Sequence, residues 1–182
     1  MSILNEISLA LQKGNRKSVT ELVNKALSEG ILATDILDNG LLAGMNEIGE
    51  KFKNNEVYVP EVLISARAMK AGVEIIKPLL IEGGVQAKGK VCIGTVQGDL
   101  HDIGKNLVKM MLEGKGLNVI DLGVDVSAET FVEKAKEAGI RDQVKIMIGG
   151  APVSQEFCDK IGADCYTVDA ASAADAAVEF CK

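Results

Sequence analysis

The stretch KVCIGTVQGDLHDIGKNLV, residues 90–108, joins an apolar run to a turn and then to the start of a helix. Residues 90–96 are rich in β-branched side chains, which predicts a buried strand. Gly98 marks the turn, and a helical pattern follows over residues 105–115. A strand that leads directly into a helix is the repeating unit of a parallel α/β sheet.

The same unit recurs through the rest of the chain. Further strands are expected at residues 118–124, 144–150 and 165–170, and further helices at 127–139, 152–161 and 172–181. Ser127 is suited to cap the first of these helices, and Pro152 to open the second. Strands that alternate with helices predict a doubly wound, Rossmann-like parallel sheet, also called flavodoxin-like.

The first 82 residues have a helical period only. Leu4, Ile7 and Leu11 share one face, comparable apolar faces follow in the next two segments, and Pro60 stands where a fourth helix begins. Four amphipathic helices with short connections predict an antiparallel bundle. Residues 83–89 contain three glycines and predict a linker, so the expected domains are 1–82 and 90–182.

Composition narrows the classes of partner. The chain has 182 residues, a formal net charge of −6 and 3% aromatic residues, with no basic face and no aromatic platform for bases, so no nucleic acid partner is expected. No apolar run reaches the roughly 20 residues of a membrane span. The N-terminus lacks the pattern of a secretory signal, and the four cysteines form no CxxC pair. A cytoplasmic protein with reduced thiols is therefore expected.

The turn after the first predicted strand carries the only histidine, His101. In one interpretation the turn is purely structural, and Asp99 caps the following helix. In the other, Asp99 accepts a hydrogen bond from one imidazole nitrogen and leaves the second nitrogen for a metal. One histidine is too few for a zinc site, so the metal would take its other ligands from a macrocycle.

The run Asp99-x-His101-x-x-Gly104, between GTVQG and KNLV, resembles the cobalamin-binding motif of corrinoid proteins and cobalamin-dependent methyltransferases. The stretches FKNNEVYVPEVLISARAMKAG, VIDLGVDVSAETFVEKAKE and VKIMIGGAPVSQEFCDKIGAD extend the resemblance to the small two-domain corrinoid proteins of anaerobic methyl-transfer systems. The resemblance implies a helical cap and a cobalamin domain, with His101 as the lower axial cobalt ligand and Asp99 as its hydrogen-bond acceptor. It also implies that the following residues line the cofactor: Thr95, Gln97, Gly98, Asp102, Ile103, Gly104, Gly149, Gly150 and, from the cap, Met69.

By resemblance the chain is a methyl carrier, not a complete catalyst. Its implied partners are a substrate:corrinoid methyltransferase, a second methyltransferase with a thiol or tetrahydrofolate acceptor, and a reductive activase. Two alternatives stay open: a cobalamin-dependent sensor, and a flavodoxin-like module that has lost cobalamin. The spacing of Met69 is equally typical of a bundle core residue.

The chain departs from the family in length. Only 45 positions separate Gly104 from Gly149, which leaves room for helix, strand, helix and strand. The family has one further strand and helix there, with a Ser-x-Leu element that holds the nucleotide tail; Thr95 and Thr167 are the candidates to replace its hydroxyl. We therefore expect a sheet of four strands in place of five, direct pairing of residues 144–150 with 90–96, and weaker cofactor binding.

Overall fold

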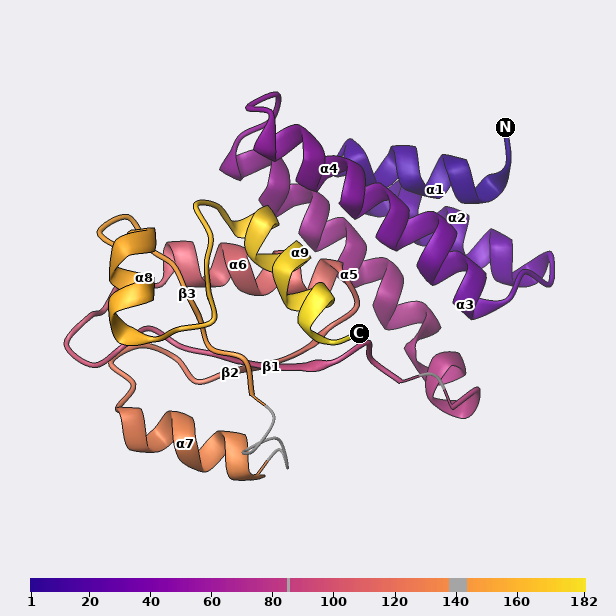
Figure 1. Ribbon diagram of the computed structural model, residues 1–182. Coiled ribbons are helices and arrows are strands. Elements are labelled where there is room, and N and C mark those ends of the chain that lie inside the picture. Colours follow the sequence, from indigo (N-terminus) through magenta and orange to yellow (C-terminus); the bar gives the residue numbers. More distant parts are fainter. Residues whose placement is uncertain (85, 138–143) are drawn as a thin grey trace. The chain divides into compact units, whose positions relative to one another are not determined.

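The computed structural model describes residues 1–84, 86–137 and 144–182. The chain divides into two compact units, Met1–Ala87 and Lys88–Lys182. The first unit is helical and the second combines helices with short parallel strands (Figure 1).

The first unit contains four helical segments. They are α1 (Ile3–Gln12), α2 (Arg16–Ser28), the continuous run of α3 (Ala33–Asp35), η1 (Ile36–Leu42) and α4 (Ala43–Lys53), and α5 (Val59–Glu82). Pro60 lies in the first turn of α5, as predicted, and Glu61 accepts the backbone N–H of Tyr58 at 3.0 Å. Helix α5 packs along α2, and α1 contacts α2, η1 and α4. The predicted bundle of four helices is confirmed.

The third helical segment contains a π-helix, which the sequence pattern did not predict. Residues Ile36–Leu42 form a helix with wider turns, so Ile36 and Leu41, five positions apart, are both fully buried. An ordinary α-helix would bring Leu37 and Leu41 onto the core face together. The wider turn replaces Leu37, which is half-buried, with Ile36.

The second unit begins with β1 (Lys90–Ile93), α6 (Ile103–Gly114), β2 (Asn118–Asp121) and α7 (Ala128–Glu137). It continues with β3 (Met147–Ile148), α8 (Gln155–Ile161), β4 (Cys165–Tyr166) and α9 (Ala170–Phe180). Helices α6 and α9 pack together on one side of β1 and β2, and α7 lies on the other side (Figure 1). Five buried alanines of α9 allow this close packing. The α/β class predicted from the sequence is confirmed.

The strand pairing differs from the expected one. Strand β1 pairs in parallel with β2, and β3 pairs in parallel with β4, so the described residues form two separate two-stranded sheets. The expected pairing of β3 with β1 is wrong. Strand β3 is only two residues long; just before it, Asp164 accepts the backbone N–H of Ile146 at 2.8 Å, and Gly149 follows it directly. So short a strand offers little of the ladder that direct pairing would need.

The predicted helix starts have mixed outcomes. Ser127 accepts the N–H of Thr130 at 3.2 Å and precedes α7, as predicted. Pro152 does not open α8; it lies in a turn, and α8 begins at Gln155 with Ser154 as its cap. A serine hydroxyl accepts the free N–H of the first turn, which proline cannot do. Residues 138–139 of the expected helix 127–139 lie outside the described residues.

Candidate functional site

The turn between β1 and α6 brings Asp99 and His101 together. Asp99 Oδ1 accepts the backbone N–H of His101 at 2.9 Å and lies 2.6 Å from His101 Nδ1. These hydrogen bonds, first from the backbone and then from the ring, hold the pKa of Asp99 below its ordinary value of 3.8. Asp99 does not cap α6, which begins at Ile103; its carboxylate interacts with His101 instead.

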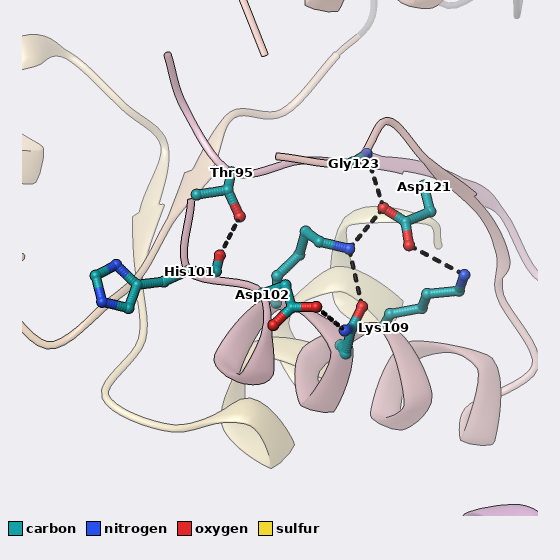
Figure 2. A network of polar contacts seen from close by, with 8 residues as sticks. Thr95, His101, Asp102, Lys109, Asp121 and Gly123 are labelled. Carbon is teal, nitrogen blue, oxygen red and sulfur yellow. Dashed lines mark hydrogen bonds and ion pairs between the residues drawn. The ribbon is translucent and has the colours of Figure 1, made fainter. Parts of the chain in front are cut away.

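The imidazole of His101 faces away from the protein. Its side chain is 95% exposed, and in Figure 2 the ring points away from the polar residues around the start of α6. With Nδ1 bound to Asp99, the lone pair of Nε2 is available for an external ligand. An imidazole in this arrangement is suited to bind a metal that is presented to the surface of the domain.

The main chain on both sides of Asp99 is fixed by neighbouring side chains. Thr95 Oγ1 donates to the carbonyl of His101 at 2.7 Å, and the N–H of Gly98 donates to Asp125 Oδ1 at 2.8 Å. The hydroxyl of Thr95, a candidate to hold the nucleotide tail, is thus engaged with the histidine backbone. The turn is therefore shaped before any cofactor arrives.

A cluster of charged residues joins α6 to the end of β2 (Figure 2). Asp121 lies at the end of β2 and binds Lys105 at 2.7 Å and Lys109 at 3.1 Å, one helical turn apart on α6. Partial burial raises the pKa of Asp121, but hydrogen bonds from Lys105, the Gly123 N–H and Lys109 outweigh it and lower the pKa to about 2. Sequence reasoning did not identify this cluster as part of the site.

Two of the four glycines of the predicted site border open space. A Cβ added to Gly98 or Gly104 would meet no atom within 4 Å, and Gly98 has a φ of +85°. Gly149 and Gly150 follow β3, and a Cβ on either of them would contact a neighbouring atom at 3.6 Å. A bulky ligand can therefore approach the backbone closely at Gly98 and Gly104.

Four apolar side chains are exposed at the carboxyl ends of the strands. The exposed fractions are 63% for Val96, 73% for Leu100, 77% for Ile103 and 81% for Val168. These are the highest values among the large apolar residues described in the second unit. Val96, Leu100 and Ile103 lie within five residues of His101 along the chain, and exposed apolar side chains beside an exposed imidazole suit a large, largely apolar ligand that carries a metal. In the described part of the chain, no three His, Cys, Asp or Glu side chains gather as a metal site.

The remaining predicted residues occupy different settings. Gln97 is exposed beside Gly98, and Asp102 precedes α6, where its carboxylate accepts from Asn106 Nδ2 at 3.2 Å. Met69 belongs to the other unit, on α5, and is only 6% exposed among the core residues of the bundle. Met69 lies on the apolar face of α5, and packing in the bundle core explains its burial without a contact to the cofactor.

Both units match family models described as B12 binding domains. One model matches residues 3–77, and a second matches residues 89–141. The two matches cover more than half of the chain and include the whole turn with His101. The chain is therefore a two-domain B12-binding protein, and cobalamin is its cofactor.

The relatives narrow the family further. The chain is 38% identical to a corrinoid protein of Desulfitobacterium hafniense, with 99% of this chain and 96% of the relative covered. It is 43% identical to the trimethylamine corrinoid protein of Methanosarcina barkeri, with 80% and 81% covered. A solved methanol:cobalamin methyltransferase complex from the same organism superposes with a TM-score of 0.82 at 28% identity, over 97% of this chain and 80% of that chain. The chain belongs to the small corrinoid proteins of methyltransferase systems.

The alignment also bears on the length of the chain. The Desulfitobacterium hafniense relative aligns over 211 positions, whereas this chain has 182 residues. At least 29 aligned positions therefore have no counterpart here, which is about the size of one strand and helix with their loops. The second family match ends at residue 141, close to the section in which the sequence predicts the missing unit.

Proposed function

We propose that this protein is a methyl carrier that binds cobalamin with Nε2 of His101 as the lower axial ligand of cobalt. The observation that carries the proposal is the exposed imidazole whose other nitrogen lies 2.6 Å from Asp99, in a turn bordered by open glycines. When bound, cobalamin supplies the cobalt centre that accepts and releases the methyl group.

The residues of the turn have separate parts in this proposal. Asp99 accepts the proton-bearing nitrogen of His101 and so fixes the ring and its tautomer. Thr95 holds the carbonyl of His101 at 2.7 Å, and Gly104 leaves the first turn of α6 free for the ligand. Gln97, Asp102 and Ile103 border the same turn, and we place them along the cofactor with Gly149 and Gly150.

We propose three protein partners for the carrier. A substrate:corrinoid methyltransferase would load the methyl group, and a second methyltransferase would pass it to a thiol or tetrahydrofolate. A reductive activase would restore an oxidised cofactor. The names of the trimethylamine relative and of the methanol:cobalamin methyltransferase complex support a methyltransferase partner.

We further propose that the carrier works in the cytoplasm. All four cysteines are free thiols, which is typical of a reducing compartment. No helix in the described ranges is both long and apolar enough to cross a membrane.

The test compares cofactor binding in the wild type and in His101→Ala. Each protein is incubated with hydroxocobalamin under reducing, anaerobic conditions and desalted, and its visible spectrum is recorded. We expect the wild type to retain a histidine-ligated corrinoid and His101→Ala to retain less of it, with a changed spectrum. Added imidazole should restore the wild-type spectrum in the variant, because it supplies the missing ligand.

The substitution should leave the fold intact, because the His101 side chain is 95% exposed. Circular dichroism of the two apoproteins provides this control. Identical corrinoid spectra in the wild type and in His101→Ala would contradict the proposed ligation. Methyl loading is then measured with labelled trimethylamine, dimethylamine or methanol and the matching methyltransferase.

A further inference from the structure

The loop after β2 contains an aspartate in an unusual backbone conformation. Asp125 has a φ of +54°, and in the described ranges only Asn55 shares a positive φ among non-glycine residues. Aspartate and asparagine tolerate this region better than other side chains, yet it still strains the backbone. Such a residue is retained where its neighbours require it.

The contacts of Asp125 explain the conformation. Its Oδ1 accepts the N–H of Gly98 at 2.8 Å, and its own N–H donates to the carbonyl of Asp99 at 3.0 Å. One residue therefore binds the main chain on both sides of the peptide bond that joins Gly98 to Asp99. The side chain of Asp99, which accepts from the backbone N–H of His101 and contacts its ring, belongs to this fixed segment.

The loop that presents Asp125 is itself fixed at both ends. Asp121 accepts the N–H of Gly123 at 3.0 Å and binds two lysines of α6. Backbone hydrogen bonds join Thr95 to Gly123 at 3.0 Å and Val126 to Thr95 at 2.9 Å. The carboxylate of Asp125 is thus held on a rigid support opposite the histidine turn.

We infer that Asp125 is a positioning residue that sets the direction of the Asp99–His101 pair toward cobalt. This inference rests on the proposed function. The contacts run from Asp125 to the Gly98 N–H and the Asp99 carbonyl, and from the Asp99 carboxylate to Nδ1 of His101. Without the Asp125 carboxylate, the Gly98 N–H loses its acceptor. Gly98 has a φ of +85° and can adopt many backbone conformations, so the orientation of the imidazole becomes less fixed.

Three variants separate positioning from simple stability. Asp125→Gly removes the carboxylate but relieves the positive φ, and because these two effects on stability oppose each other, the melting temperature of the apoprotein should change little. Asp125→Asn keeps an oxygen acceptor and the tolerance for positive φ, and should restore the wild-type behaviour in part. Asn55→Gly is the matched control, because it relieves the same strain outside the histidine turn.

Two measurements follow the turn itself. In the apoprotein, hydrogen exchange of the Gly98 amide should accelerate roughly fivefold in Asp125→Gly, which corresponds to one hydrogen bond of about 1 kcal/mol. In protein with ¹⁵N-labelled histidine, loaded with cob(II)alamin, electron paramagnetic resonance reports the nitrogen bound to cobalt. The ratio of histidine-ligated to unligated cofactor should fall roughly fivefold in Asp125→Gly and stay unchanged in Asn55→Gly.

The outcomes distinguish this inference from the proposed function. If the wild type shows no labelled-nitrogen splitting, the proposed ligation is wrong. If the wild type shows it and Asp125→Gly shows the same ligated fraction, only the positioning role is wrong. Faster exchange at Gly98 with an unchanged ligated fraction would likewise reject the link from Asp125 to the histidine.

Discussion

The charged cluster at the end of β2 gives a quantitative prediction for Asp121→Asn. In the wild type, Asp121 binds Lys105 and Lys109, and its pKa lies at about 2 instead of 3.8. The substitution removes the negative charge that neutralises Lys105, whose side chain is only 7% exposed, and leaves this ammonium group with neutral acceptors only, such as Asn106 Oδ1 at 2.9 Å. We therefore expect the second unit to lose stability.

The magnitude follows from the pKa. A pKa difference of one corresponds to about 1.4 kcal/mol, so a fall from 3.8 to about 2 represents about 2.5 kcal/mol. The Asp121 side chain is 23% exposed, so solvent screens this interaction only in part. Because the folded state lowers the pKa, this stability is present above pH 3.8 and is lost as the pH falls through about 2. About half of it should be gone near pH 3.

The assay is urea unfolding of the second unit at several pH values. The chain has no Trp and two Tyr, so a Tyr58→Phe background leaves Tyr166 of β4 as the only tyrosine reporter. Glu137→Gln, which removes an exposed carboxylate 2.6 Å from Lys134 in the same unit, is the control and should change stability by less than about 0.5 kcal/mol. A difference between Asp121→Asn and the wild type that is equally large at pH 7 and pH 3 would refute the reasoning.

Three further substitutions have defined expectations. Gly72→Ala should destabilise the first unit by about 1–3 kcal/mol in urea unfolding, because the new Cβ would lie 2.8 Å from a Leu41 methyl group; an unchanged midpoint would contradict the tight packing. Ser154→Ala should cost the second unit about 1 kcal/mol in the same assay, since Ser154 accepts the N–H of Phe157 at 3.2 Å. Gly104→Ala should stabilise the apoprotein by up to about 1 kcal/mol but weaken cobalamin binding in a spectral titration, because the methyl group enters open space of the proposed site; equal affinity would place the cofactor elsewhere.

Local patterns predicted the parts of the fold that depend on neighbours in the chain. We could recognise the apolar faces of α1 and α5 and the strand–turn–helix at residues 90–114 from the sequence. In these segments apolar residues recur every 3.6 residues in helices and every two residues in strands, within a short stretch of chain. The same holds for the hydrogen bond between Asp99 and His101, which are two positions apart. A short span between two groups makes their contact predictable.

Contacts across larger separations were not predictable in this way. Asp121 lies 16 positions from Lys105, and Asp125 lies 27 positions from Gly98. A signal for the first pair did exist, because Lys105 and Lys109 stand at i and i+4 on a helix that runs beside a strand ending in an aspartate. The separate pairing of β3 with β4 had no such signal, since partner choice depends on the whole sheet.

The side-chain hydrogen bonds that fix the histidine turn come from residues that precede α7. Thr95 lies just after β1, Asp121 ends β2 and Asp125 lies in the loop after β2, and none of these hydrogen bonds involves β3 or β4. The missing strand and helix would stand between β1 and β3, which do not pair in the described residues. The shortened chain can therefore keep the geometry around His101 while it changes the support for Gly149 and Gly150. Under the proposed function, ligation of cobalt and retention of the rest of the cofactor would therefore depend on different parts of this domain.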